Sequence, residues 1–77
     1  MNDIKYVIID DCFPVVFSAA IPHKDVAIGL CSHGPVTSAG FLTDQGDHIS
    51  AHGESVSLDI KSKPGDSRIL TRFLKGN

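Results

Sequence analysis

The chain has 77 residues, a formal net charge of −2 and 42% hydrophobic residues. This predicts a single domain, residues 1–77, whose own core is marginal, because a chain of this size buries only about 60% of the surface that its unfolded form exposes. No apolar run approaches the roughly 20 residues of a membrane helix, and the N-terminus does not resemble a signal peptide, so we expect a cytoplasmic protein with no membrane contact and with reduced cysteines.

Two apolar segments near the N-terminus predict a β-hairpin. Residues 4–9 are almost wholly apolar and β-branched, and residues 13–20 form a second apolar run. Asp10 and Asp11 between them suit a turn. Pro14 has no N–H to donate to a sheet, so we expect it at the start of the second strand. Because both strands are apolar on both faces, we expect the hairpin at the centre of a sheet.

Residues 22–30 fit either a short helix or a strand. Pro22 suits a first helical turn, and Val26 and Leu30 have the i, i+4 spacing of a helix. Apolar residues at every second position from Val26 to Leu30 also match a strand. We predict the helix, because Gly29 would weaken the interior of a strand. The five residues after Leu30 have the composition of a loop.

The following part of the chain predicts three more strands. Residues 36–43 and 48–52 flank a short connector, residues 44–47, which contains one glycine and two aspartates as a hairpin loop should. Residues 56–60 alternate strictly between apolar and polar, which predicts a strand with one buried and one solvated face.

The C-terminal segment predicts a helix that opens within residues 62–67 and stops at Gly76. Asp66 is expected at the helix start, as a cap or in the first turn. The apolar stripe of this helix consists of Ile69, Leu70, Phe73 and Leu74. Burying four such side chains contributes about 6–12 kcal/mol gross, so we expect the helix to be integral and Phe73→Ala to cost about 3–5 kcal/mol.

These elements predict an α+β fold. It consists of an antiparallel sheet of four to five strands, a C-terminal helix packed on one face, and a short helix after the first hairpin. The chain contains no internal repeat and no low-complexity tract.

The charges of the chain are segregated. Residues 61–77 contain five basic residues and one acidic residue, whereas residues 1–60 contain two basic and eight acidic residues. This asymmetry predicts that the basic segment docks onto its own chain or onto a partner. Arg68, Arg72 and Lys75 lie away from the apolar stripe of the predicted helix, and we predict them to be the partner-binding residues.

Four histidines and one cysteine fall within thirty residues in the middle of the chain. A zinc site needs three or four such side chains in a tetrahedral arrangement, and their spacing matches no standard finger. If residues 48–52 form a strand, His48 and His52 face solvent. We therefore predict no bound metal and no cofactor. The weak metal candidates are Cys31, His33, His48 and His52.

Anion and nucleic-acid binding have limited support. Lys61 and Lys63 precede a helix N-terminus, which can bind phosphate, but Asp66 at that position would repel an anion and no P-loop motif is present. We expect nucleic-acid binding through the basic helix face to be weak at most, because the isoelectric point is near 6.0 and tryptophan is absent.

The function predicted from these features is a small intracellular interaction module that associates with itself and does not catalyse a reaction. A strand that is apolar on both faces needs a cover on each side, and one long helix covers only one. The second face must be met by the short helix or by another subunit, and we expect a homodimer. The alternative is a ligand-binding or enzymatic protein that uses the histidine-rich middle, although Gly-x-Ser-x-Gly is absent. The third hypothesis is a weak nucleic-acid binder.

Overall fold

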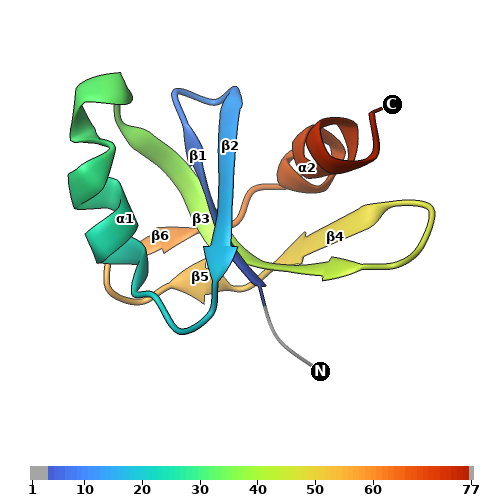
Figure 1. The fold of residues 1–77 in the computed structure, drawn as a ribbon, viewed down its shortest axis with the longest axis horizontal. Helices are drawn as coiled ribbons and strands as arrows, with labels where there is room; N and C mark the ends of the chain where they lie inside the picture. Colours follow the sequence, from blue (N-terminus) through green and yellow to red (C-terminus); the bar gives the residue numbers. More distant parts are fainter. Residues whose placement is uncertain (1–3, 77) are drawn as a thin grey trace.

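The computed structural model describes residues 4–76, and the predicted fold class is confirmed: a four-stranded antiparallel sheet carries a helix on each side (Figure 1). The elements in chain order are β1 (Ile4–Ile9), β2 (Phe13–Ser18), α1 (His23–Gly29), the 3₁₀ turn η1 (Cys31–His33), β3 (Val36–Asp44), β4 (Ile49–His52), β5 (Glu54–Ser55), β6 (Ile60–Lys61) and α2 (Asp66–Lys75). Within the described residues, no helix is long and apolar enough to span a membrane.

The strand order of the sheet is β2-β1-β3-β4, so β1 is central and β2 is an edge strand. The prediction of a hairpin at the sheet centre is therefore correct for β1 and wrong for β2. The reason lies in the pairing of β3, which returns to the free side of β1 with Tyr6 opposite Gly40. Pro14 is the second residue of β2 and lies opposite Ile8. An edge strand tolerates this proline, because one side of its backbone has no partner in the sheet.

One face of the sheet packs against α2 and holds the main core. The buried residues of this cluster are Tyr6, Ile8, Leu42, Ile49 and Leu70. They come from β1, β3, β4 and α2, so the core joins both ends of the chain. Val16, Ala51 and Ile69 pack around it and are partly buried.

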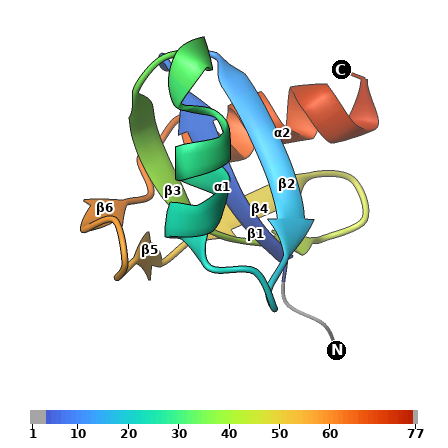
Figure 2. The same cartoon turned by 60° about the vertical axis from the view of Figure 1, so that its left-hand side comes forward.

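The opposite face of the sheet is covered by α1, which crosses it in Figure 2. Val7 and Ile9 of β1 and Ala39 of β3 point to this side and are at most 1% exposed. The first residue of α1, His23, is itself buried. The helix predicted after the hairpin is thus confirmed, and it supplies the second cover within one chain. Of the two covers expected for this face, the short helix and another subunit, the structure shows the helix, and the homodimer stays a prediction.

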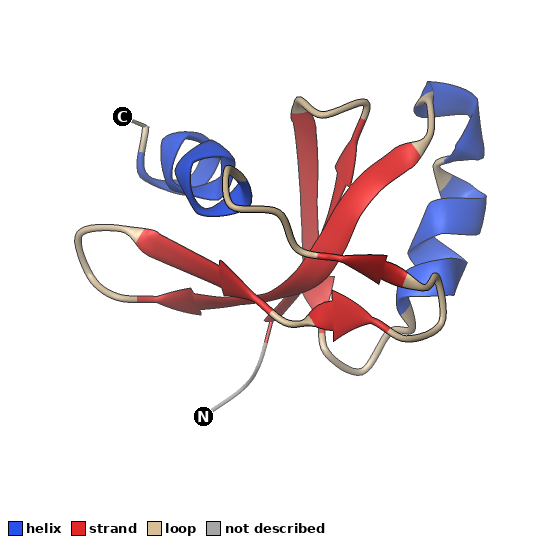
Figure 3. Ribbon diagram, turned by 180° about the vertical axis from the view of Figure 1, so that it is seen from behind, coloured by secondary structure: helices blue, strands red, loops and turns tan. Residues whose placement is uncertain are grey.

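The strand predicted over residues 56–60 is also wrong. Instead, a turn separates the two-residue strands β5 and β6, which form a small ribbon beside the start of α1 (Figure 3). The N–H of Leu58 donates to Ser55 Oγ, and Asp59 adopts a positive φ of 55°. These features close the chain into a turn, which leaves Val56 86% exposed. The alternation of apolar residues there does not correspond to a buried face.

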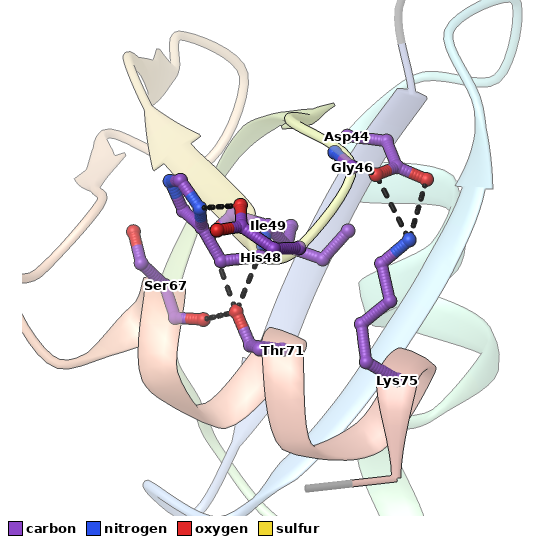
Figure 4. A network of polar contacts seen from close by, with 8 residues as sticks. Asp44, Gly46, His48, Ile49, Ser67, Thr71 and Lys75 are labelled. Carbon is purple, nitrogen blue, oxygen red and sulfur yellow. Dashed lines mark hydrogen bonds and ion pairs between the residues drawn. The ribbon is translucent and has the colours of Figure 1, made fainter.

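Helix α2 lies against the free edge of β4, as Figure 4 shows from close by. The N–H of Ile49 donates to Thr71 Oγ1 at 2.8 Å, and the N–H of Ala51 donates to Ser67 Oγ at 2.9 Å. The helix therefore provides hydrogen-bond partners for an edge that would otherwise be open to another strand. Ser67 and Thr71 are one helical turn apart, which matches the spacing of alternate residues on the strand.

Because of this placement, the side of α2 that faces the sheet differs from the predicted apolar stripe. Leu70 is fully buried, but Phe73 is 53% exposed and Leu74 is 42% exposed. The side of the helix that carries Ser67, Leu70 and Thr71 faces the sheet, because the hydroxyl groups bind the edge of β4. The helix is integral to the core through Leu70, and the cost predicted for Phe73→Ala is too high for a half-exposed ring.

Candidate functional site

The start of α2 is fixed by a buried polar cluster. Asp66, which is 2% exposed, accepts hydrogen bonds from Tyr6 Oη at 2.5 Å, from Ser38 Oγ at 2.9 Å and from the N–H of Lys63 at 2.9 Å. Burial, followed by the hydrogen bond to Asp66, raises the pKa of Tyr6 far above its ordinary value. Asp66 lies in the first turn, as predicted, and its side chain holds the helix start against the sheet.

The β1–β2 turn is held next to this helix start. Asp10 and Asp11 both have positive φ, 55° and 60°, as the central residues of a tight hairpin turn require. The N–H of Asp11 donates to Thr37 Oγ1 at 2.9 Å. The Asp11 carboxylate pairs with Lys63 Nζ at 3.1 Å, and this neighbour lowers the pKa of Asp11. Lys63 thus connects the turn to α2 through its side chain and through its backbone bond to Asp66.

Between the turn and the helix lies a groove of about 370 Å³, which we call the hairpin–helix groove. Its lining residues are Asp11, Cys12, Pro14, Arg68, Ile69, Arg72 and Phe73. Most of these side chains present apolar surface, and charged groups occupy both walls. Figure 1 shows the two elements that form the walls, the β1–β2 hairpin and α2. Because both walls are anchored to the sheet, the groove is formed without rearrangement of the chain.

The predicted partner-binding residues do not act as one group. Arg68 and Arg72 are exposed side chains that line the groove, and neither forms an ion pair within residues 4–76. Lys75 instead pairs with Asp44 at 2.9 Å, with its side chain 25% exposed, on the side of α2 that faces the β3–β4 turn (Figure 4). The structure therefore uses Lys75 to attach the helix to its own sheet.

The other basic residues of the C-terminal segment also meet acidic residues of the same chain. Lys63 pairs with Asp11, whereas Lys61 lies opposite Glu54 in the β5–β6 ribbon and forms no ion pair among residues 4–76. The predicted docking of the basic segment onto its own acidic body thus occurs at several points. Lys61, Arg68 and Arg72 are the basic residues of the segment that form no ion pair among the described residues, and of these Arg68 and Arg72 line the groove.

The structure does not bring the four metal candidates together. Cys31 and His33 lie in η1, after α1. His48 is exposed and contacts Asp47 in the β3–β4 turn, while His52 at the end of β4 contacts Thr43. His48 and His52 face solvent on either side of a buried Ile49, as the strand pattern predicted. Within residues 4–76, no three histidine, cysteine or acidic side chains are grouped as metal ligands.

The anion candidates are likewise separated. Lys61 lies in β6, and Lys63 is occupied by Asp11. The N–H of Lys63 donates to the Asp66 carboxylate, so the start of α2 already holds a negative group. An anion at this position would face the Asp66 charge, as the sequence predicted.

A second hollow, of about 340 Å³, lies beside the start of α1. His23 lines it together with Lys5, Phe41 and Glu54. The Nε2–H of His23 donates to the Gly40 carbonyl at 2.9 Å, and the ring meets Phe41 edge-on. Burial, assisted by the nearby Lys5 charge, lowers the pKa of His23. This histidine packs on the α1 face of the sheet.

Sequence reasoning missed the hairpin side of the groove. Cys12 and Pro14 contribute to its lining only because the β1–β2 turn folds next to α2, more than fifty residues later in the chain. The signal that could have located this wall is the pair of opposite charges, Asp11 and Lys63, each next to a turn or a helix start. Comparison of the chain with models of protein families, with curated proteins and with solved structures gave no match.

Proposed function

We propose that the protein is a small interaction module that works by docking rather than by catalysis, with the hairpin–helix groove as its docking surface. The observation that supports this is the pair Arg68 and Arg72, whose exposed guanidinium groups lie beside an apolar lining without an acidic partner among residues 4–76. Arginine binds carboxylates through two parallel hydrogen bonds and is enriched at the centres of protein interfaces.

The chemistry of the groove defines the partner. Ile69, Pro14 and the half-exposed ring of Phe73 offer apolar contact, and the two arginines offer positive charge. A protein surface that carries carboxylates next to an aromatic or aliphatic side chain would complement both features. Exposed aromatic and arginine side chains in one groove are typical of recognition surfaces.

The two other predicted functions have less support. An enzyme or ligand-binding protein based on Cys31, His33, His48 and His52 would need these side chains in one site, and the structure distributes them over η1, the β3–β4 turn and β4. A nucleic-acid binder would need a basic stripe, whereas Lys63 and Lys75 are paired with carboxylates.

A titration with short synthetic peptides tests the proposal. The protein, labelled with ¹⁵N and kept at micromolar concentration, is titrated with a peptide of alternating glutamate and phenylalanine. We expect backbone chemical-shift changes at Cys12, Arg68 and Arg72 and none in α1. A peptide with lysine in place of glutamate is the ligand control.

The matched protein variants are Arg68→Glu with Arg72→Glu, which should abolish the changes, and Lys24→Glu on α1, which should retain them. Lys24 is a suitable control because it is exposed and lies outside the groove lining. The proposal is overturned if millimolar acidic peptide produces no shift, or if the shifted residues lie outside the groove.

A further inference from the structure

The hairpin–helix groove lies beside an edge of the sheet. Pro14, one of its lining residues, belongs to β2, and β2 ends the strand order β2-β1-β3-β4 (Figure 1). The other edge strand, β4, is covered by hydroxyl groups of α2. Strand β2 has β1 as its only neighbour in the sheet among residues 4–76. A strand edge of this kind can pair with an extended segment of another molecule.

The free backbone groups of this edge belong to Pro14 and Val16. In an antiparallel pair, alternate residues direct both backbone groups to the neighbouring strand, and the residues between them direct both away. The hydroxyl of Thr37 in β3 donates to the Ile8 carbonyl at 3.2 Å, so Ile8 directs its groups to β3. Pro14 lies opposite Ile8 and therefore directs its backbone outward, as does Val16 two residues later. Pro14 offers a carbonyl alone, whereas Val16 offers a carbonyl and an N–H.

The two faces of β2 differ in their chemistry. Val16 packs around the core under α2, so Val16 and Pro14 lie on the face where the groove carries its two unpaired arginines. Phe13 lies opposite Ile9 on the α1 face and is 49% exposed. Phe17 lies on the same face, where its ring meets the first residue of α1. The edge therefore has positive charge on one face and aromatic surface on the other.

An added antiparallel strand would meet both faces in a fixed alternation. Residues directly opposite each other in such a pair have their side chains on the same face. The residues that bond to Pro14 and Val16 would thus direct their side chains toward Arg68 and Arg72, where carboxylates fit. The residues between them would direct their side chains to the face of Phe13, where apolar groups fit.

We propose that the partner of the hairpin–helix groove is an extended segment in which acidic residues alternate with apolar ones, and that this segment adds to β2 as a fifth, antiparallel strand of the sheet. This inference rests on the proposed docking function and names the conformation and sequence pattern of the partner. Main-chain hydrogen bonds supply affinity in such complexes, and the alternating side chains supply specificity.

Two N-methylated forms of the peptide of alternating glutamate and phenylalanine test the added strand. Methylation of every glutamate nitrogen removes the N–H groups that donate to the carbonyls of Pro14 and Val16, so we expect the dissociation constant to rise at least about tenfold. Methylation of every phenylalanine nitrogen removes N–H groups that point away from β2 and should leave the dissociation constant nearly unchanged. The two peptides have the same charge and the same side chains, and the ¹⁵N titration measures both.

The protein offers matched readouts of its own. On binding of the unmethylated peptide, hydrogen exchange should slow at the Val16 amide more than at the Val15 amide, which is directed to β1. Phe13→Ala should weaken binding, because it removes the exposed ring next to the added strand. Val56→Ala removes an exposed apolar side chain outside β2 and the groove lining, and it should leave binding unchanged.

The added strand is overturned if the unmethylated peptide binds and the two methylated peptides bind equally well, or if methylation of phenylalanine is the more harmful change. In that case the docking function of the groove stands, because the side chains alone account for binding. If the unmethylated peptide does not bind at millimolar concentration, the docking function fails and the inference fails with it. The two failures are therefore separate results.

Discussion

Removal of the buried carboxylate of Asp66 should be among the most destabilising single changes in this protein. Asp66→Ala leaves three donors without their acceptor: the hydroxyls of Tyr6 and Ser38 and the N–H of Lys63. Tyr6 and Ser38 are at most 1% exposed, so water cannot replace the lost partner without rearrangement. Each buried donor left unsatisfied costs about 1–3 kcal/mol, and we expect a total loss of about 3–5 kcal/mol. The total free energy of unfolding of a domain of this size is about 4–12 kcal/mol.

Urea unfolding followed by circular dichroism measures this loss. The slope of the free energy of unfolding against urea concentration should be the same in the variant and the wild type. Tyr6→Phe removes one donor and leaves Asp66 two others, so it should cost less, about 1.5–3 kcal/mol. In the Asp66→Ala background the same change should cost much less, because the two residues form one network. Asp25→Ala is the matched control, since Asp25 also lies in the first turn of a helix but is exposed. An Asp66→Ala variant as stable as Asp25→Ala would refute the reasoning.

The same cluster predicts a dependence on alkaline pH. Burial and the hydrogen bond to Asp66 raise the pKa of Tyr6 in the folded state, whereas the pKa of tyrosine in the unfolded chain is about 10. Below pH 10 the stabilisation from neutral Tyr6 is fully present, and it is lost as the pH rises above this value. Tyr6 is the single tyrosine of the chain, so near-ultraviolet absorbance of tyrosinate reports this group alone. Ionisation near pH 10 in the folded protein would contradict the prediction.

Three further predictions follow from burial and packing. Leu70→Ala should lower the free energy of unfolding by about 2–5 kcal/mol, because Leu70 is fully buried. Phe73→Ala should cost no more than about half as much, because Phe73 is half exposed. Urea unfolding of the two variants measures both losses. Gly40→Ala should unfold the domain at a markedly lower temperature, since its Cβ would lie 2.5 Å from a carbonyl oxygen at the end of β4; equal melting temperatures would show that the strands adjust. Burial lowers the pKa of His23 in the folded state. The contribution of this residue to the free energy of unfolding should therefore be fully present above about pH 6.5, the ordinary pKa of histidine, and should be lost as the pH falls below it. His23→Gln should remove this pH dependence, and His48→Gln should retain it.

The sequence by itself determined most of the secondary structure and the fold class. The β-branched run of β1, the glycine-terminated α2, and the alternation that points Ile49 to the core and His48 to solvent are local patterns, and each corresponds to a face or an end of one element. Helix α1 was also determined locally, because Gly29 disfavours the competing strand. Such patterns report the backbone geometry and the apolar face of a segment, which depend on residues close in the chain.

The tertiary structure alone decided which of these faces became covered and which charges stayed free. Val56 follows an alternating pattern but lies in a turn, and Phe73 belongs to an apolar stripe but is half exposed, because helix α2 turns its hydroxyl groups toward the edge of β4. The groove depends on contacts between residues that are far apart in the sequence. Asp11 and Lys63 are separated by 52 positions, and Tyr6 and Asp66 by 60 positions. No local pattern encodes which acidic residue each basic residue will meet. That choice depends on the packing of the whole chain, and here it neutralises Lys63 and Lys75 and leaves Arg68 and Arg72 available for a partner.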